Sequence, residues 1–152
     1  MFKLEVPKKY CQQDWENFLN ATCYTYALNL LTNERLYIGD IYLKKRIATS
    51  CSDQEVISAL IKEAEAIGYS ISETTENEKV KKDELKICIV REDTVGYYHL
   101  YREEREGFWT HKKPMELPNN IGYDGKVIYN PKEAVEPGYD KIFYYKLKIL
   151  NT

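Results

Sequence analysis

The stretch that decides the fold spans residues 96–113 and reads GYYHLYREEREGFWTHKK. Two short runs rich in aromatic and β-prone residues flank a charged segment that ends in a glycine, which is the pattern of a β-hairpin with a longer loop. Both histidines of the chain, His99 and His111, lie in this stretch. The sequence therefore predicts a pair of antiparallel strands that brings the two imidazoles together. The charged run 102–106 is interpreted as a solvated hairpin tip.

Further strand signals lie on both sides of the hairpin. Residues 69–72, 85–90 and 141–150 have the β-prone composition of strands, and a short strand is expected after the Asp-Gly turn within 119–131. A helix is expected between Ser52 and Gly68, because Ser52 and Glu55 form a capping-box pattern and Gly68 is a typical stop. Helices followed by four to six strands predict an α+β fold, with N-terminal helices packed on an antiparallel sheet, in a single domain over residues 1–152.

The first helical segment leaves two alternatives open. Residues 14–31 carry apolar side chains at helical spacing. If Asn20 or Thr22 caps a helix that starts between them, Cys23 lies in its first turn, where free N–H groups and the helix dipole stabilise a thiolate. If the helix begins at Asp14, Cys23 is an inert interior residue. The position of the helix start therefore decides the chemistry of this thiol.

Composition narrows the classes of function. The net charge is −2, with 22 basic and 24 acidic side chains, so no general attraction to nucleic acid is expected. No apolar run has the length of a signal peptide or a membrane span, which predicts a cytoplasmic protein with no membrane partner, although release as an effector stays open. The four cysteines form no close pair and are expected to be free thiols, with Cys88 in the core.

The cysteine and the histidines together resemble a known family. Thr22-Cys23-Tyr24 at a helix start, His99-Leu100-Tyr101 opening one strand and Trp109-Thr110-His111 closing the next are similar to the layout of papain-like cysteine hydrolases, and most of all to the NlpC/P60 family of bacteria and phages. The two histidines are twelve residues apart, a spacing similar to that of the family. The resemblance covers less than half of the chain. It implies a papain-like, NlpC/P60-like fold and a cysteine peptidase or amidase.

The chemistry assigns a role to each of these residues. A thiol with an ordinary pKa of about 8.5 needs a neighbouring base, which predicts Cys23 as the nucleophile and His99 as the general base. His111 is expected to orient His99, with Asp124 or Asn130 as the alternative orienting residue. The backbone N–H of Cys23 is the expected oxyanion donor. Three aromatic residues are candidates for the wall of a substrate cleft: Tyr24, Tyr26 and Trp109.

No cofactor is expected. A zinc site built from the two histidines with a cysteine or Asp124 is a weaker hypothesis, because no ligand pair has close spacing. The sequence thus favours a cysteine-dependent hydrolase of amide bonds. Its partner is a peptide, a peptidoglycan-like substrate as the resemblance implies, or an intracellular protein. The alternative from another class is a non-catalytic binding module, of phage or mobile-element type, that captures a nucleotide or a host protein.

Overall fold

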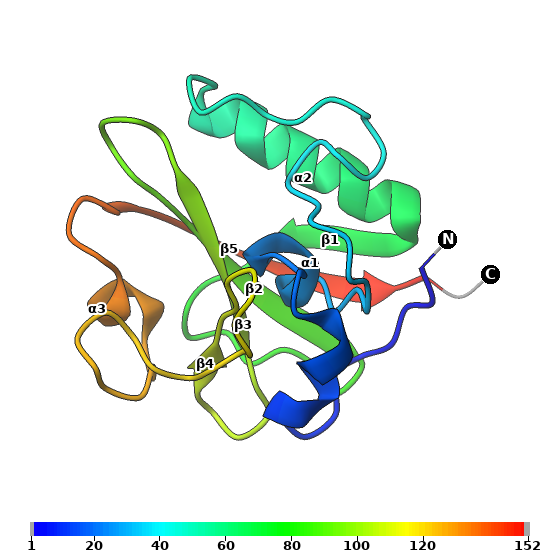
Figure 1. Cartoon of the computed structure of the whole chain (residues 1–152), viewed down its shortest axis with the longest axis vertical. Coiled ribbons are helices and arrows are strands. Elements are labelled where there is room, and N and C mark those ends of the chain that lie inside the picture. Colours follow the sequence, from blue (N-terminus) through cyan, green and yellow to red (C-terminus); the bar gives the residue numbers. More distant parts are fainter. Residues whose placement is uncertain (1, 151–152) are drawn as a thin grey trace.

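A five-stranded antiparallel sheet and a few helices make up the fold, which is α+β (Figure 1). The computed structural model describes residues 2–150. The strands lie in the order β1-β5-β2-β3-β4, so the C-terminal strand is inserted between β1 and β2. The elements in chain order are η1 (Gln12–Phe18), α1 (Cys23–Ala27), α2 (Asp53–Ile67), β1 (Tyr69–Glu73), β2 (Glu84–Arg91), β3 (Tyr98–Glu103), β4 (Trp109–Thr110), α3 (Pro131–Ala134) and β5 (Lys141–Ile149).

Strand β2 is the centre of the sheet and is covered on both faces. It pairs with β3 on one side and with β5 on the other, both antiparallel. Leu85, Ile87 and Ile89 point into the main core beneath α1 and α2, whereas Cys88 and Val90 point into a second cluster on the opposite face. Burial on both faces explains why apolar residues alternate with a buried cysteine and a valine rather than with solvated side chains. The core position expected for Cys88 is confirmed.

Helix α2 has the boundaries that its capping signals predict. The Ser52 side chain accepts from the N–H of Glu55, and the Glu55 side chain accepts from the N–H of Ser52, so the capping box is complete. Gly68 ends the helix at φ 116°, a conformation that L side chains rarely adopt. The helix lies along β1 and covers one face of the sheet (Figure 1).

The N-terminal segment divides into two short elements, which settles the choice between the two helix starts. Residues 12–18 form a 3-10 helix, and α1 then begins at Cys23 with Thr22 as its cap. The Thr22 side chain accepts from the N–H of Thr25 and donates to the carbonyl of Leu36, so this helix start is fixed in the fold. Cys23 is therefore the first residue of α1.

Two local expectations are wrong. The residues after the Asp-Gly turn form only an isolated bridge, Ile121 with Val127, and then enter α3 instead of a strand of the sheet. The run 102–106 is not a solvated tip throughout, because Arg102 and Glu104 are 3% and 4% exposed. Their charges are paired inside the molecule by a 2.9 Å contact from Nε to Oε2, which allows their burial.

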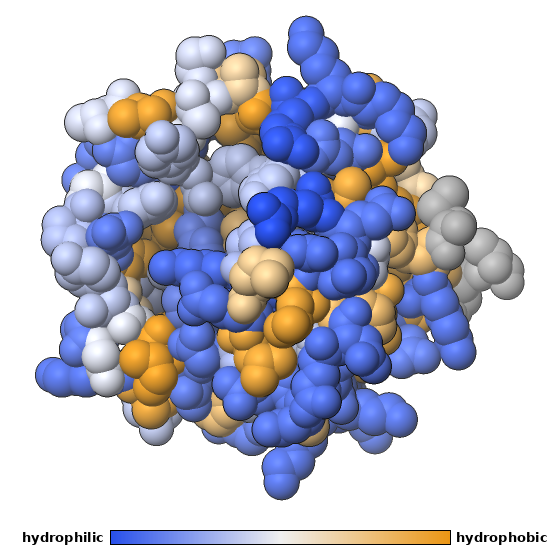
Figure 2. Space-filling view, in the orientation of Figure 1, coloured by the Kyte–Doolittle hydropathy of each residue, from blue (hydrophilic) through white to orange (hydrophobic). Residues whose placement is uncertain are grey.

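No helix within residues 2–150 combines the length and the apolar character that a membrane crossing requires. The surface seen in Figure 2 is mostly hydrophilic, with apolar atoms in separate places rather than in one continuous band.

Candidate functional site

The two histidines of the hairpin lie side by side. His99 Nε2 and His111 Nδ1 are 2.8 Å apart, a hydrogen-bond distance, and the rings meet edge to face with centroids 5.0 Å apart. The register of β3 and β4 pairs Arg102 with Thr110, so the next pair in the ladder is Tyr101 with His111. These two rings are stacked with centroids 5.0 Å apart. Strand pairing therefore brings the imidazoles together, as the hairpin predicts.

The hydrogen bonds fix the tautomer of each ring. His111 Nε2 lies 2.8 Å from the carbonyl oxygen of Ile121, which only accepts hydrogen bonds, so this nitrogen carries a proton. In the neutral ring, His111 Nδ1 is then an acceptor, and the proton between the rings belongs to His99 Nε2. The remaining nitrogen, His99 Nδ1, therefore has a free lone pair. A neutral imidazole in this tautomer can accept a proton at Nδ1.

Both rings are kept neutral by their surroundings. Burial, followed by the charges of His111 and Lys113, lowers the pKa of His99 to about 3. Burial also lowers the pKa of His111, and the Lys113 ammonium adds to this effect against the contribution of the Ile121 carbonyl. The desolvated pair therefore carries no proton beyond its two N–H groups at neutral pH.

Cys23 lies beside the strand that carries His99. The backbone N–H groups of Leu100, Tyr24 and Cys23 itself lie near enough to the sulfur to favour its anionic form. Leu100 directly follows His99 on β3, and Cys23 and Leu100 belong to the same buried core cluster. No hydrogen bond joins the Cys23 sulfur to an imidazole in residues 2–150. Catalytic contacts are often longer without substrate than in the reacting complex.

The expectation of a stabilised thiolate is wrong for this resting state. Cys23 is 8% exposed and belongs to the main core cluster. Burial raises the pKa of the thiol to about 11, because desolvation outweighs the three N–H groups that favour the anion. The cysteine and His99 are thus a neutral thiol and a neutral imidazole rather than an ion pair.

A cleft of about 480 Å³ opens at the histidines. Strand β3, the segment 111–123 and the chain around α3 form its walls, and Figure 2 shows this face hollowed between the middle of the molecule and the part that carries α3. The side chains that line it include both imidazoles, four tyrosines and three free charged groups: His99, His111, Tyr98, Tyr101, Tyr123, Tyr139, Lys113, Glu116 and Glu136. Sequence reasoning missed these tyrosines, since they are brought together only by the fold.

The aromatic residues expected to wall the cleft do not line it. Tyr24 is fully buried and donates to Glu63 on α2, with 2.8 Å between the oxygens. Tyr26 is also fully buried, and its hydroxyl lies 2.7 Å from Thr110 Oγ1. Trp109 is 2% exposed and packs in the second core cluster. These predictions are wrong because each ring is enclosed in a different core cluster: Tyr24 in the main one, Tyr26 beside Trp15, and Trp109 in the second one.

The alternative orienting residues are also placed elsewhere. Asp124 accepts from the N–H of Lys126 within an exposed turn, and Asn130 caps α3 by accepting from the N–H of Lys132. Neither lines the cleft. Of the three candidates, only His111 makes a hydrogen bond with His99.

Two buried cations hold α1 and its preceding loop against the hairpin. Arg102 on β3 donates to the Tyr26 carbonyl and hydroxyl and to Glu104. Lys112, directly after His111, donates to the carbonyls of Leu19 and Ala21 at 2.8 and 2.7 Å. These bonds fix the chain on both sides of Cys23 relative to the strand ends that carry the histidines.

A metal site receives no support from the side-chain arrangement. Within the described part of the chain, no group of three or more His, Cys, Asp or Glu side chains is placed to hold a metal ion. In comparisons with family models, with curated proteins and with solved structures, no match to this chain was found.

Proposed function

We propose that this protein is a cysteine-dependent hydrolase of amide bonds, with an arrangement similar to that of NlpC/P60 enzymes. Cys23 is the nucleophile, His99 the general base and His111 the orienting residue. The observation that carries the proposal is the chain of hydrogen bonds from the Ile121 carbonyl through His111 to His99. This chain leaves His99 Nδ1 unprotonated on the strand against which the thiol is held.

The first step starts from a neutral pair. As the Cys23 sulfur attacks the scissile carbonyl carbon, its proton passes to His99 Nδ1, and the S–C bond forms. The Nδ1 proton then passes to the leaving nitrogen as the C–N bond breaks, which leaves a thioester on Cys23. Water, deprotonated by the same nitrogen, cleaves the thioester and restores the thiol. His111 stabilises the transient imidazolium by accepting from His99 Nε2.

Backbone N–H groups near the sulfur favour the same step. The N–H groups of Cys23 and Tyr24 lie in the first turn of α1, where helix N–H groups have no internal partner, and both favour the thiolate. An oxyanion that forms next to the sulfur meets these donors. Such donors are typically worth a factor of roughly 10² to 10³ in acyl transfer.

The binding-module alternative is favoured by a different observation. The thiol is 8% exposed, its pKa is about 11, and Cys23 does not line the cleft. On this alternative, the cleft and its tyrosines hold a ligand, and Cys23 is a packing residue.

An activated ester separates the two functions without knowledge of the natural substrate. A chain with Cys11→Ser and Cys51→Ser, which removes the two more accessible thiols, is mixed with p-nitrophenyl acetate. The hydrolase should give a stoichiometric burst of nitrophenolate, with the acetyl group mapped to Cys23 by mass spectrometry. Cys23→Ala and His99→Ala should both abolish the burst. Acetylation that is spread over lysines and is indifferent to both changes supports the binding module instead.

A further inference from the structure

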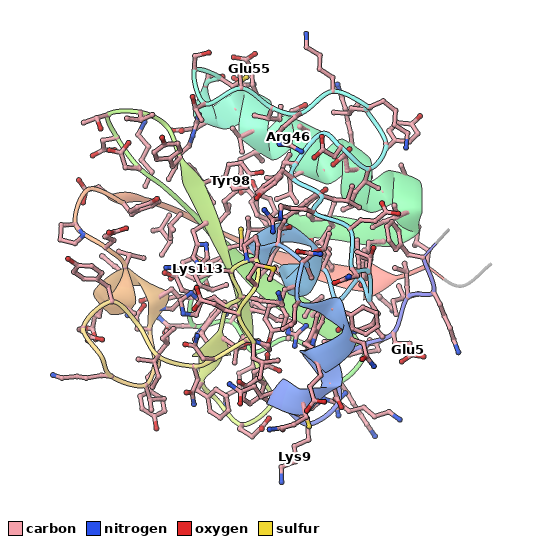
Figure 3. All side chains as sticks on the ribbon, viewed as in Figure 1. Glu5, Lys9, Arg46, Glu55, Tyr98 and Lys113 are labelled. Atoms are coloured by element: carbon pink, nitrogen blue, oxygen red, sulfur yellow. The ribbon has the colours of Figure 1, made fainter. Side chains whose placement is uncertain are left out.

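The cleft contains one ammonium that the fold does not use. Lys112 and Lys113 both line the cleft, but Lys112 is 1% exposed and its Nζ donates to backbone carbonyls. Lys113 is exposed, and its side chain forms no ion pair or hydrogen bond with any residue in 2–150. In Figure 3, Lys113 lies in the middle of the molecule, whereas Lys9 projects from the rim. Its charge is therefore available to a ligand in the cleft.

The two acidic groups of the cleft are placed differently from Lys113. The Lys113 ammonium lowers the pKa of both imidazoles. Glu116 raises the pKa of His111 by a smaller amount and does not contribute to the pKa of His99. Glu136 lies two residues after the end of α3 and raises the pKa of Tyr101 and Tyr139. Lys113 thus places a positive charge in the part of the cleft that holds the imidazoles, whereas Glu136 places a negative charge near α3. A bound anion is stabilised at the first position and repelled at the second.

We infer that the cleft selects acyl substrates that carry a carboxylate close to the scissile carbonyl, and that Lys113 binds this carboxylate. The inference rests on the proposed hydrolase function, because it assumes that the substrate carbonyl reaches Cys23 beside His99. A peptide-like amide with a free α-carboxylate or a side-chain carboxylate next to the cleaved bond belongs to this class. Lys113 is then a substrate-binding residue and takes no part in proton transfer.

Matched alkylating reagents test the charge preference directly. Iodoacetate and iodoacetamide attack a thiol by the same reaction: the S–C bond forms, the C–I bond breaks, iodide leaves, and the thiol proton passes to His99. N-iodoacetylglycine and its amide form a second pair, with the carboxylate farther from the reacting carbon. The rates are measured at Cys23 by mass spectrometry, in the chain that carries Cys11→Ser and Cys51→Ser. For each pair, the ratio of the alkylation rates with the anionic and the amide reagent is divided by the same ratio for the chain unfolded in urea.

The variants separate the local charge from the overall charge. Lys113→Gln should lower the normalised anion/amide ratio about fivefold in at least one of the two pairs, which is the size expected for a partly exposed charged contact. Lys113→Glu should lower it further. Lys126→Gln removes the same charge from an exposed residue outside the cleft and should leave both ratios unchanged.

The outcomes distinguish this inference from the proposed function. If Cys23 reacts and depends on His99, but both ratios are the same with and without Lys113, the inference is wrong and the hydrolase proposal stands. If Cys23 of the folded chain reacts with none of the four reagents, or reacts equally without His99, both fail together. If Lys126→Gln lowers the ratios as much as Lys113→Gln does, the effect is one of net charge and the inference is again overturned.

Discussion

At the scale of single residues, the site depends on which nitrogen of each imidazole carries the proton. The carbonyl of Ile121 determines the tautomer of His111, and His111 in turn determines that of His99. No side-chain carboxylate takes part in this chain of hydrogen bonds. His111 therefore holds the ring of His99 by a hydrogen bond without adding a negative charge, which is consistent with the low pKa of His99.

Replacing His111 tests its orienting role. His111→Ala removes the acceptor for His99 Nε2–H and should lower the rate of Cys23 acetylation by a factor of roughly 10², the lower end of the general-base contribution. His111→Gln supplies a carbonyl oxygen that accepts from the same N–H, so it should retain a larger part of the rate. The nitrophenolate burst measures both variants. Equal rates for the Ala and Gln variants would show that the hydrogen bond to His99 has no role in the reaction.

The low pKa of His99 also predicts a pH dependence of stability. In the unfolded chain His99 gains a proton near its ordinary pKa of 6.5, whereas in the folded chain it does so only near 3. Between these values the unfolded state binds more protons, so stability is lost as the pH falls from 6.5 toward 3.

The contribution of His99 is isolated by a variant. His99→Gln should reduce the loss of unfolding free energy between pH 7 and pH 4.5 by about 1–2 kcal/mol, a value discounted for the partial exposure of the ring. Urea denaturation at the two pH values gives the difference. Carboxylates such as Glu92, whose pKa is lowered to about 2, act equally in both proteins and cancel in the comparison. An unchanged pH dependence would mean that His99 titrates normally in the folded state.

At the scale of elements, the short helix α1 is held by α2 through one buried carboxylate. Glu63 on α2 is fully buried and accepts from the Tyr24 hydroxyl, next to Cys23. It also accepts from three backbone N–H groups in the loop 37–47, those of Gly39, Tyr42 and Leu43. Gly39 has φ +101°, and a side chain at this position would clash with the Lys45 carbonyl. Only glycine therefore allows the loop to pass over this carboxylate in its observed conformation. A helix of five residues needs such a partner, because its own hydrogen bonds are too few.

Changing Glu63 should therefore destabilise the fold. Glu63→Gln places an NH₂ group against N–H or O–H donors at one of the two oxygens, and should lower the unfolding free energy by about 2 kcal/mol. Glu63→Ala leaves four donors without an acceptor and should cost about 3–5 kcal/mol. Glu65→Gln, at an exposed position two residues away on the same helix, is the control and should change stability by about 0.5 kcal/mol or less. If the Glu63 and Glu65 variants are equally stable, the carboxylate does not hold the loop.

The sequence predicts elements well where the local signal is also the structural cause. The Ser52–Glu55 capping box and Gly68 set the ends of α2 directly, and alternation in 85–90 gives β2 its two faces. The hairpin itself also follows from the sequence, but its register does not, because a bulge in the loop 103–107 would have moved His111 to the other face; the observed register brings His99 and His111 together. Short segments such as 126–130 are not predictable in this way. Val127 and Ile128 are β-prone, but they form only single contacts with the segment 120–122 and with Trp109 of β4 before Asn130 caps α3.

At the scale of the whole molecule, buried charged residues hold together the segments, far apart in the chain, that form the site. In the sequence these residues look like ordinary surface residues. Arg102 and Glu104 lie in a run of five charged residues, and Lys112 stands next to another lysine. Periodicity does not show which member of such a run is buried, since that depends on carbonyls and hydroxyls supplied by α1 and the loop before it. The cleft tyrosines were missed for the same reason. Long-range polar pairing is thus the part of the site that sequence reasoning did not reach.

Lys112 provides the test of this assembly. Its ammonium is the only donor to the Ala21 carbonyl found in the described residues, and Ala21 lies two residues before Cys23. Lys112→Met keeps an unbranched side chain as far as Cε but removes the ammonium, which leaves that carbonyl buried without a donor. It should lower the unfolding free energy by about 2 kcal/mol, measured by urea denaturation. Lys126→Met, at an exposed site, should leave stability nearly unchanged.

The same Lys112→Met variant shows whether Lys112 positions Cys23 relative to the imidazoles or only stabilises the fold. Because Lys112 connects the residue after His111 to the loop before Cys23, its loss should slow the acetylation of Cys23 well below the melting temperature, where the chain is still folded by circular dichroism. Lys112→Arg, which keeps N–H donors at the end of the chain, should restore part of the rate. A purely structural role would instead lower the melting temperature and leave the rate of the folded protein unchanged. The rate thus shows whether this buried cation sets the distance between the thiol and the imidazoles.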